Sequence, residues 1–463
     1  MKLPAYPCTK PSGVEWLGDV PVHWEVKRLR RVLAESLQYG ANESAELDDP
    51  DLPRYVRITD VHENGTLRPD TFRSLPKDIA APYLLKDGDL LFARSGATSG
   101  KTFLYQNSWG ICAYAGYLIR ARMSQQKALP AFVKYFTTST NYWQWLSSVF
   151  IQSTIQNVSA EKYAELYLSL PPPAEQRAIA AFLDRETGRV DRLVAKKREL
   201  IERLKEKRTA LISDCVTGKA EVRRMKDEKS RISYFRLHPS SLPKKPSGIE
   251  WLGDIPKHWG TPPLCTRYSV ELGKMLNEGR IVGHALVPYL RNIDVQWDRI
   301  NFDDLPEMDI EERERERFTL KDGDLLVCEG GEVGRAAIFK GRAEVTGFQK
   351  ALHRMRPLNP RERTRFMFYM LTWASSQGIF FAEGNPNTIP HLTGEKLRRY
   401  RFPQPPLPEQ AAIAAYLDEE TAKLDALVGK VEEAVERLQE YRTALITAAV
   451  TGKIDVRKTA VSG

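Results

Sequence analysis

The sequence predicts an α+β protein made of two homologous mixed α/β domains and two long helices that pair with each other. Three observations predict it: most motifs occur twice, a strand-rich texture precedes each long helix, and both helices carry an apolar heptad. The chain has 463 residues, of which 42% are hydrophobic and 10% aromatic, and this is enough apolar material for several cores.

An internal repeat is the most informative feature of the chain. PSGVEWLGDVPVHW at 11–24 returns as PSGIEWLGDIPKHW at 246–259, and LKDGDLL at 85–91 returns at 320–326. PPPAEQRAIAAFLDRETGRVDRL at 171–193 returns as PPLPEQAAIAAYLDEETAKLDAL at 405–427, and RTALI followed by VTGK closes both copies at Lys219 and Lys453. Two copies with so long a period indicate a pseudo-dimer within one chain rather than a solenoid.

Each copy divides into a strand-rich part and a helix. Short apolar runs alternate with Gly, Pro, Asn and Asp clusters through 1–170 and 246–404, which predicts one mixed, strand-rich globular domain in each range. Long helical patterns begin just after prolines, so we expect helical regions at 171–219 and 405–453. The remaining ranges are expected to be a linker at 220–245 and a tail at 454–463. The linker carries 8 Lys/Arg and 3 Asp/Glu, and it either lies near nucleic acid or is a solvated tether.

Both helical regions carry an apolar seam at heptad spacing, which favours coiled-coil pairing. The seam residues are Ile179, Leu183, Val190, Leu193, Leu200, Leu204 and Leu211 in the first, and Ile413, Leu417, Leu424, Leu427, Val431, Leu438 and Leu445 in the second. Residues 174–214 carry 11 Lys/Arg and 8 Asp/Glu, a net +3, whereas residues 408–448 carry 4 and 9, a net −5. Opposite charges favour pairing of the two helices with each other over self-association, and leave their direction open. The alternative is a pair of surface helices that share only ancestry.

The overall charge favours an anionic partner. Lys and Arg number 69 and Asp and Glu 60, a net +9, which favours nucleic acid first and a membrane surface second. Five cysteines lie far apart without metal-ligand spacing, so we expect no metal site and ordinary thiols of a reducing compartment. Because no apolar stretch of about 18 residues and no signal core is present, we expect a cytoplasmic protein.

A loop at 90–102, LLFARSGATSGKT, resembles a phosphate-binding P-loop in part. Gly100, Lys101 and Thr102 match G-x-x-x-x-G-K-[ST], but the first glycine position is Ser95. Aligned residue by residue, its sister segment 330–337 lacks Gly-Lys-Thr. We therefore expect no nucleotide site, and two interpretations stay open: a turn that offers cations to a phosphate, or a purely structural hairpin.

Motifs of catalysis are missing from the sequence. It has no Asn/Asp-Pro-Pro-aromatic motif of DNA methyltransferases, no G-x-G-x-x-G before a helix, no H-E-x-x-H and no G-x-S-x-G. The repeated His-Trp pairs at 23–24 and 258–259 are most simply structural. We expect no catalytic residue in this chain.

The ordered set of motifs, present twice and covering nearly the whole chain, resembles the specificity (S) subunit of type I restriction-modification systems. That resemblance implies two target recognition domains, an antiparallel coiled coil, and docking of two methyltransferase (M) subunits, joined by restriction (R) subunits. It also implies that S-adenosylmethionine, ATP and magnesium bind to the partner subunits and no cofactor binds to this chain, and that adenine N6 is methylated in double-stranded DNA.

Candidate DNA contacts follow from residue chemistry, because Arg and Lys suit phosphates and guanine edges while Asn and Gln suit adenine edges. The candidates are Arg57, Arg94, Lys101, Gln152, Gln156 and Asn157 in the first copy, and Arg291, Arg335, Gln349, Lys350, Asn385 and Asn387 in the second. RYVRITDV at 54–61 and PYLRNIDV at 288–295 place Arg57 opposite Arg291, which makes both better phosphate or structural candidates than base readers.

Outside those motifs the two recognition domains differ, which predicts an asymmetric bipartite target. A helix of about 40 residues spans about 60 Å, so the half-sites are expected within about two turns of duplex. Two alternatives remain: a nucleotide-binding enzyme that uses 95–102 as a degenerate P-loop, and a coiled-coil assembly protein without specific DNA binding.

Overall fold

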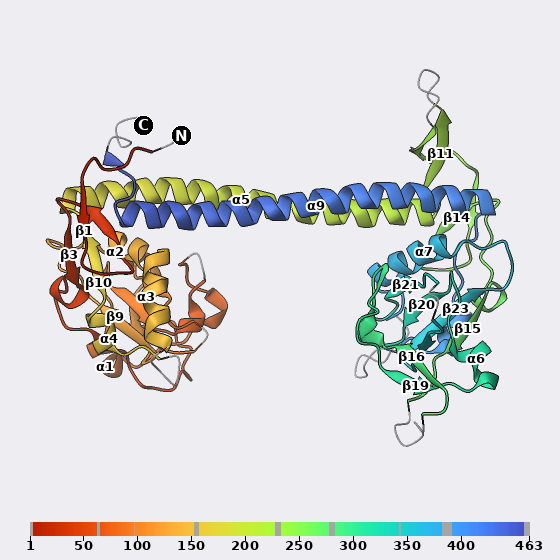
Figure 1. Cartoon of the computed structure of the whole chain (residues 1–463), viewed down its shortest axis with the longest axis horizontal. Helices are drawn as coiled ribbons and strands as arrows, with labels where there is room; N and C mark the ends of the chain where they lie inside the picture. The colour runs from red at the N-terminus through yellow and green to blue at the C-terminus, as the bar shows by residue number, and fades with distance from the viewer. Residues whose placement is uncertain are drawn as a thin grey trace. The chain divides into compact units, whose positions relative to one another are not determined.

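The computed structural model describes residues 3–62, 65–96, 98–151, 157–226, 233–276, 283–341, 344–381 and 391–457. The chain forms two compact units, here called unit 1 (Met1–Glu199 with Glu432–Gly463) and unit 2 (Leu200–Val431). Figure 1 labels their helices and strands. Each unit combines the strand-rich domain of one sequence copy with parts of both long helices, so the unit boundary crosses each helix.

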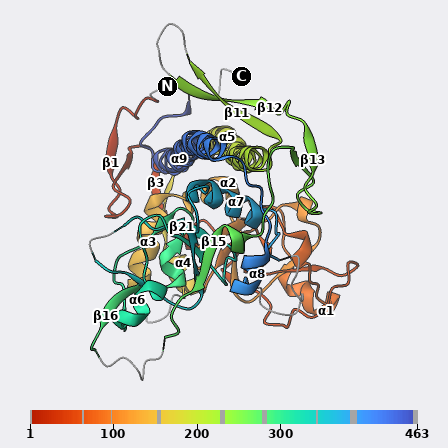
Figure 2. The same cartoon turned by 90° about the vertical axis from the view of Figure 1, so that its right-hand side faces the viewer.

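The two long helices are α5 (Pro173–Val216) and α9 (Leu407–Val450), each of 44 residues, and both lie within the helical ranges expected from the sequence. In unit 1 the start of α5 shares a core with the end of α9, because Leu183 and Leu445 belong to one cluster. In unit 2, Arg208 of α5 meets Asp425 of α9 at 3.0 Å. Residue numbers rise along one helix where they fall along the other, so α5 and α9 run antiparallel in each unit, side by side (Figures 1 and 2).

The seam between the helices follows a different set of positions from the one expected. Buried residues of α5 alternate at steps of four and three, through Leu183, Thr187, Val190 and Val194. The predicted seam is wrong at Leu193, Leu200 and Leu427, which are 42%, 44% and 47% exposed. Ile179, Leu183, Val190, Ile413, Leu417, Leu424 and Leu445 are buried, and Leu204, Leu211, Val431 and Leu438 are half-buried. An apolar residue directly follows each of the three exposed positions, at Val194, Ile201 and Val428, so spacing alone does not select the one that faces the partner helix.

The strand-rich domain of unit 1 is built on an antiparallel sheet of order β4–β9–β6–β7, comprising Gln38–Tyr39, Leu118–Ala121, Leu90–Ala93 and Thr102–Leu104. Smaller pairs are β1 (Thr9–Pro11) with β2 (Asp19–Pro21), β3 (Glu25–Arg28) with β10 (Tyr167–Leu170), and the parallel pair β5 (Arg54–Val56) with β8 (Cys112–Tyr114). Its helices are α1 (Lys77–Ala80), α2 (Pro130–Phe136), α3 (Thr140–Ile151) and α4 (Ala160–Ala164). All four residues of β6 are buried, because successive side chains enter cores on opposite faces of the sheet.

Unit 2 repeats this architecture with the sheet order β15–β23–β20–β21, comprising Tyr268–Leu272, Leu352–Pro357, Leu325–Cys328 and Ala336–Ile338. The remaining strands are β16 (Leu286–Leu290) between β19 (Glu307–Asp309) and β22 (Gly347–Phe348), β17 (Val295–Gln296) with β18 (Arg299–Ile300), and β13 (Lys244–Pro246) with β14 (Asp254–Pro256). Its helices are α6 (Glu312–Phe318), α7 (Thr364–Ser376) and α8 (Gly394–Arg399). The expected fold of two homologous mixed domains with two long helices is confirmed.

The ranges expected to be a linker and a tail contain structure in the parts that are described. In the predicted linker, β11 (Ala220–Lys226) pairs with β12 (Ser233–Pro239), and Val222 and Leu237 pack against the unit 2 core. In the predicted tail, Val456 is fully buried and the Asp455 amide donates to the Pro4 carbonyl at 2.7 Å. The connecting range thus contains two strands, and 454–457 packs against unit 1, because isolated apolar residues in polar segments complete neighbouring cores.

A repeated carboxylate joins each β-hairpin to the start of its long helix. Glu175 accepts a hydrogen bond from Trp24 Nε1 at 3.1 Å, and its Oε2 lies 2.9 Å from His23 Nε2. In unit 2, Glu409 accepts from Trp259 Nε1 at 2.9 Å and lies 2.7 Å from His258 Nε2. These contacts give the repeated His-Trp and Pro-x-x-Glu-Gln motifs one structural purpose, and a carboxylate near a helix N-terminus is also favourable.

The VTGK motif at the end of each long helix closes on the hairpin of the other sequence copy. Gly218 has φ +72°, and a Cβ there would lie 2.4 Å from the Pro256 ring. Gly452 has φ +73°, and a Cβ there would lie 2.2 Å from the Pro21 ring. Each unit is thus completed by a helix end that belongs to the other repeat, which makes the two copies structurally interdependent.

Candidate nucleic-acid interface

The segment at 90–102 is a β-hairpin and not a P-loop. β6 and β7 pair antiparallel, with Leu90 opposite Leu104 and Phe92 opposite Thr102. A P-loop leads from a strand into a helix whose N-terminus faces the phosphates, whereas residues after Lys101 continue as a strand. The nucleotide-binding alternative therefore loses its structural basis at this loop.

The sister turn between β20 and β21 places a cation at the same position. The Ala93 amide donates to the Lys101 carbonyl at 2.9 Å, and the Cys328 amide donates to the Arg335 carbonyl at 2.8 Å. Lys101 therefore corresponds to Arg335, whereas residue-by-residue alignment had matched Lys101 with Ala336. That part of the alignment is wrong, because the first turn contains one additional residue.

A shared glycine fixes both turns against the helical layer. Gly100 has φ +89° and a Cβ there would lie 2.0 Å from Leu146 of α3; Gly334 has φ +84° and a Cβ there would lie 2.5 Å from Phe380. Tyr142 of α3 also donates to the Gly100 carbonyl at 2.7 Å. The glycines are thus required by packing, and this packing positions the adjacent cation in each unit.

Arg94 and Asn157 lie together at the base of the first turn. Arg94 Nε donates to Asn157 Oδ1 at 3.3 Å, and the guanidinium lies 4.9 Å from the centroid of the Tyr39 ring. Both Arg94 and Tyr39 are half-buried. Stacking on an aromatic face and a side-chain hydrogen bond hold the arginine in one orientation, as a base-reading arginine requires.

Arg57 and Arg291 have matching internal roles. Arg57 makes two hydrogen bonds of 3.0 and 2.9 Å with Asp60, and Arg291 makes two of 2.9 and 2.8 Å with Asp294. Both carboxylates are buried, and each sits in a short 3-10 turn, Ile58–Asp60 or Asn292–Asp294. This geometry favours the structural interpretation of the two arginines over base reading, since their donors already face a buried acid.

The remaining candidates differ in how far they are engaged. Arg335 is only 13% exposed and donates to Asn292 Oδ1 at 2.9 Å, which directs it into the domain. Gln349 is half-buried and Lys350 is exposed, and their amides donate to the carbonyls of Leu290 and Lys274. Gln152, Gln156, Asn385 and Asn387 lie outside the described residues.

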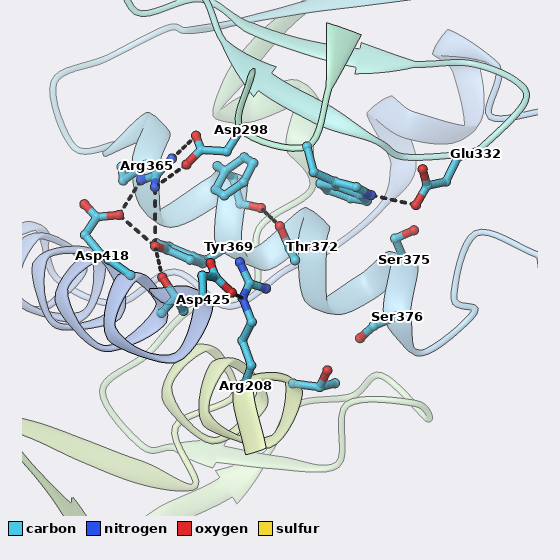
Figure 3. A pocket seen from close by; sticks show the side chains of 15 residues that line it. Arg208, Asp298, Glu332, Arg365, Tyr369, Thr372, Ser375, Ser376, Asp418 and Asp425 are labelled. Carbon is cyan, nitrogen blue, oxygen red and sulfur yellow. Dashed lines mark hydrogen bonds and ion pairs between the residues drawn. The ribbon is translucent and has the colours of Figure 1, made fainter. Parts of the chain in front are cut away.

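Unit 2 contains a cavity of about 690 Å³ between α7, α9 and the end of α5 (Figure 3). Arg365 lies on one side, where its Nε donates to Asp418 at 2.6 Å and its Nη2 to Asp298 at 2.7 Å. Tyr369 also donates to Asp418, at 2.7 Å. The two cations lining it are Arg208 and Arg365, and the four acids are Asp298, Glu332, Asp418 and Asp425, so its lining carries a formal charge of −2.

Unit 1 contains a cavity of the same size, about 690 Å³, at the equivalent place. Tyr135 donates to Asp184 at 2.6 Å there, as Tyr369 does to Asp418, and Arg442 pairs with Asp191 at 2.9 Å. Its four cations are Arg54, Lys101, Lys134 and Arg442, and its two acids are Asp184 and Asp191, a formal charge of +2. Burial lowers the pKa of Lys134 from its ordinary value. Of the two cavities, the one in unit 1 is therefore the better suited to a phosphate backbone.

Sequence reasoning missed several residues of these sites. Tyr39 gave no signal, because its contact with Arg94 joins distant strands, and Arg365 gave none, because its partners Asp298 and Asp418 are far from it in the sequence. Asp184 and Asp418 recur at matching positions of the repeat, and this recurrence was the signal available for them. Within the described ranges, no cluster of His, Cys, Asp or Glu is arranged to hold a metal ion, and no helix has the length and apolarity to cross a bilayer.

Comparison with known proteins identifies the family. The model of the type I restriction modification DNA specificity domain matches residues 21–203 and 304–437. The chain is 22% identical to the type I restriction enzyme EcoKI specificity subunit of Escherichia coli K12 (94% of this chain, 90% of the relative). It is 21% identical to the putative MjaX specificity subunit of Methanocaldococcus jannaschii (95% and 96%).

Two solved structures share the fold. One is a chain from a structure of a type I R-M system concerned with complex assembly and conformational transition, with a TM-score of 0.71 and 16% identity over 94% of this chain and 99% of that one. The other is the HsdS subunit of Thermoanaerobacter tengcongensis, with a TM-score of 0.52 and 16% identity over 94% and 98%. The expected resemblance is thereby confirmed: this chain belongs to the type I restriction-modification DNA specificity family.

Proposed function

We propose that this chain is the DNA sequence-recognition subunit of a type I restriction-modification complex and that it reads an asymmetric bipartite target. The observation that supports the proposal is the relation between the two recognition domains. They share one sheet order, one hairpin turn and one Glu-His-Trp contact, yet their cavities carry formal charges of +2 and −2. One framework with two different polar linings suits two different half-sites.

Lys101 is the residue on which we test DNA contact in unit 1. It lies at the end of the hairpin turn and lines the positively charged cavity. Lys101→Ala in the assembled complex should weaken binding to duplex DNA and lower the slope of log affinity against log salt by about 1. Lys10→Ala, at an exposed strand residue of the same unit, is the matched control. Loss of assembly, or unchanged DNA binding, would contradict a DNA contact at Lys101.

Methyltransferase subunits are the partners that best fit the exposed apolar side of α5. Leu193 is 42% exposed in unit 1, and Leu200 is 44% exposed in unit 2. Burying them against a partner is favourable by about 1.5 kcal/mol or more for each side chain. Leu193→Asp with Leu200→Asp should abolish co-purification with the methyltransferase subunit. Ala195→Asp, on the other side of the helix, should leave co-purification intact.

Catalysis and its cofactors belong to the partners in this proposal. Two methyltransferase subunits bring S-adenosylmethionine and methylate adenine N6, and restriction subunits bring ATP and magnesium, in the cytoplasm where the DNA lies. Isothermal titration of the isolated chain with S-adenosylmethionine or ATP should give no heat of binding. Measurable binding of either would favour the enzyme alternative. A coiled-coil assembly protein, the second alternative, predicts salt-insensitive or absent DNA binding by the complex.

A further inference from the structure

Arg94 of unit 1 and Glu329 of unit 2 occupy one position in a matched backbone. The Arg94 amide donates to the Tyr117 carbonyl at 3.0 Å, and the Arg94 carbonyl accepts from Val158 at 2.9 Å. The Glu329 amide donates to the Ala351 carbonyl at 2.9 Å, and the Glu329 carbonyl accepts from Leu392 at 2.8 Å. Both residues directly follow the central sheet strand that enters the hairpin turn, β6 or β20. The backbone hydrogen bonds therefore match at this point, whereas the side chains differ.

The side chains around this position have changed together between the two units. Around Arg94 lie the Tyr39 ring and the Asn157 amide. Leu272 is the unit 2 equivalent of Tyr39, because β4 and β15 are the matching edge strands of the two sheets. His391 is the equivalent of Asn157, because each directly precedes the residue whose amide donates to the carbonyl of Arg94 or Glu329. All three positions carry different chemistry, whereas the helix caps two residues beyond, Ser159 and Thr393, keep the same bond.

A fourth position has adjusted to the exchange. A Cβ at Gly330 would lie 3.3 Å from the His391 ring, so the ring occupies the space beside a glycine. In unit 1 the equivalent residue is Ser95, which forms a β-bridge with the smaller Asn157. The His391 ring thus fits beside Gly330, and the Asn157 amide fits beside Ser95, so the residues at these positions are sterically matched within each unit.

The opposite charges of Arg94 and Glu329 distinguish base reading from a folding role and from a phosphate contact. A residue needed only for folding would be kept in both copies, as the turn glycines and Asp60 and Asp294 are. A phosphate contact would not tolerate a carboxylate, because DNA phosphates repel it. A base contact accepts either sign: an arginine donates two hydrogen bonds to guanine O6 and N7, and a glutamate accepts from the cytosine N4 amino group. Base reading is the role that fits both Arg94 and Glu329.

We propose that Arg94 and Glu329, with their neighbours Asn157 and His391, select one base pair in each half-site, a guanine read by Arg94 and a cytosine amino group read by Glu329. This inference rests on the proposed function and adds the residues that make the two half-sites different. The bond from Arg94 to Asn157 uses Nε, while the two terminal nitrogens have the geometry for guanine. Both residues are half-buried, which restricts their side chains before DNA binds.

The test is selection of DNA from a randomised library by the chain assembled with its methyltransferase subunits. Arg94→Ala should lose about 10-fold or more of the preference for guanine at one base pair of the first half-site and leave the second unchanged. Glu329→Gln should relax one base pair of the second half-site only. Arg31→Ala, at an exposed arginine of unit 1, is the matched control and should change no preference. The unaltered half-site reports in each experiment that the complex is folded and assembled.

A graft of four substitutions tests for a gained preference. Arg94→Glu with Tyr39→Leu, Ser95→Gly and Asn157→His transfers the unit 2 set into unit 1, and it should change the preferred base from guanine to cytosine at the same base pair. Uniform weakening across all sequences by Arg94→Ala, with a smaller salt slope, would identify a phosphate contact and overturn the inference. An unchanged preference would overturn it as well. A wild-type complex that selects no bipartite sequence would instead refute the proposed function, so the two failures are distinguishable.

Discussion

Replacing Gly452 with alanine tests how the end of the second sequence copy closes on the first. Gly452 adopts φ +73°, and its missing Cβ faces the ring of Pro21 at 2.2 Å and the Trp24 indole at 3.3 Å. Two costs follow. An L-residue at positive φ costs about 1–2 kcal/mol, and forcing a methyl group into a packed site costs about 1–3 kcal/mol more. We expect Gly452→Ala to destabilise unit 1 by about 2–5 kcal/mol.

Gly13→Ala is the control that separates the packing cost from the conformational cost. Gly13 has nearly the same φ, +76°, in the hairpin that Gly452 contacts, but a Cβ there meets nothing within 4 Å. Its replacement should cost only the conformational term of about 1–2 kcal/mol. The difference between the two variants therefore measures the packing of the helix end on the hairpin.

Hydrogen exchange gives a local readout for this comparison. The Lys453 amide donates to the Ala448 carbonyl at 2.8 Å, and the Asp455 amide donates to Pro4 at 2.7 Å, so both amides report on closure at this junction. We expect their exchange to accelerate at least tenfold more in Gly452→Ala than in Gly13→Ala. Equal acceleration in the two variants would refute the packing argument, and with it the interdependence of the two copies.

Four further predictions concern buried charge and thiol groups. Glu175→Ala should destabilise unit 1 by about 3 kcal/mol in urea unfolding, since it leaves the buried Trp24 N–H without its acceptor. Glu409→Ala should destabilise unit 2 by only about 1 kcal/mol, because Glu409 is 40% exposed and Glu175 is 7% exposed. Equal losses of stability would contradict the burial argument. Arg57→Ala should cost about 2–3 kcal/mol because it leaves the buried Asp60 carboxylate unpaired, and lost DNA binding at unchanged stability would instead assign Arg57 to DNA. Burial raises the thiol pKa to about 12 for Cys112 and Cys215 and to about 11 for Cys328. At pH 8, iodoacetamide should therefore modify the two exposed thiols, Cys8 and Cys265, first. Early modification of a buried thiol would contradict this prediction. Because the unfolded thiols release protons near pH 9 while the folded ones retain them, stability should fall as the pH rises above about 9.

The repeat made much of the fold predictable. Two copies of each motif delimit the domains and the helices, and α5 and α9 begin and end within a few residues of the expected ranges. Sister comparison also directed attention to the 90–102 loop as a turn, and β6 and β7 form a hairpin there. These features are local, so the residues that determine them are neighbours in sequence.

Features that depend on contacts between residues far apart in the chain could not be predicted from the sequence. Leu193 and Val194 are adjacent and both apolar, and only contact with the second helix decides that Val194 is buried. VTGK was visible as a motif, but nothing in it says that Gly218 packs on the Pro256 of the other copy. The same holds for Arg94, whose orientation depends on a tyrosine in another strand of the sheet.

The most direct test of the account is to express this chain with its methyltransferase subunits in a host that lacks adenine methylation and to map every modified base in the genome. The account predicts methylated adenines in two dissimilar half-sites that are separated by a constant number of unspecified base pairs. A palindromic target, a single contiguous target or methylation without sequence preference would contradict recognition by two differently lined domains on one framework.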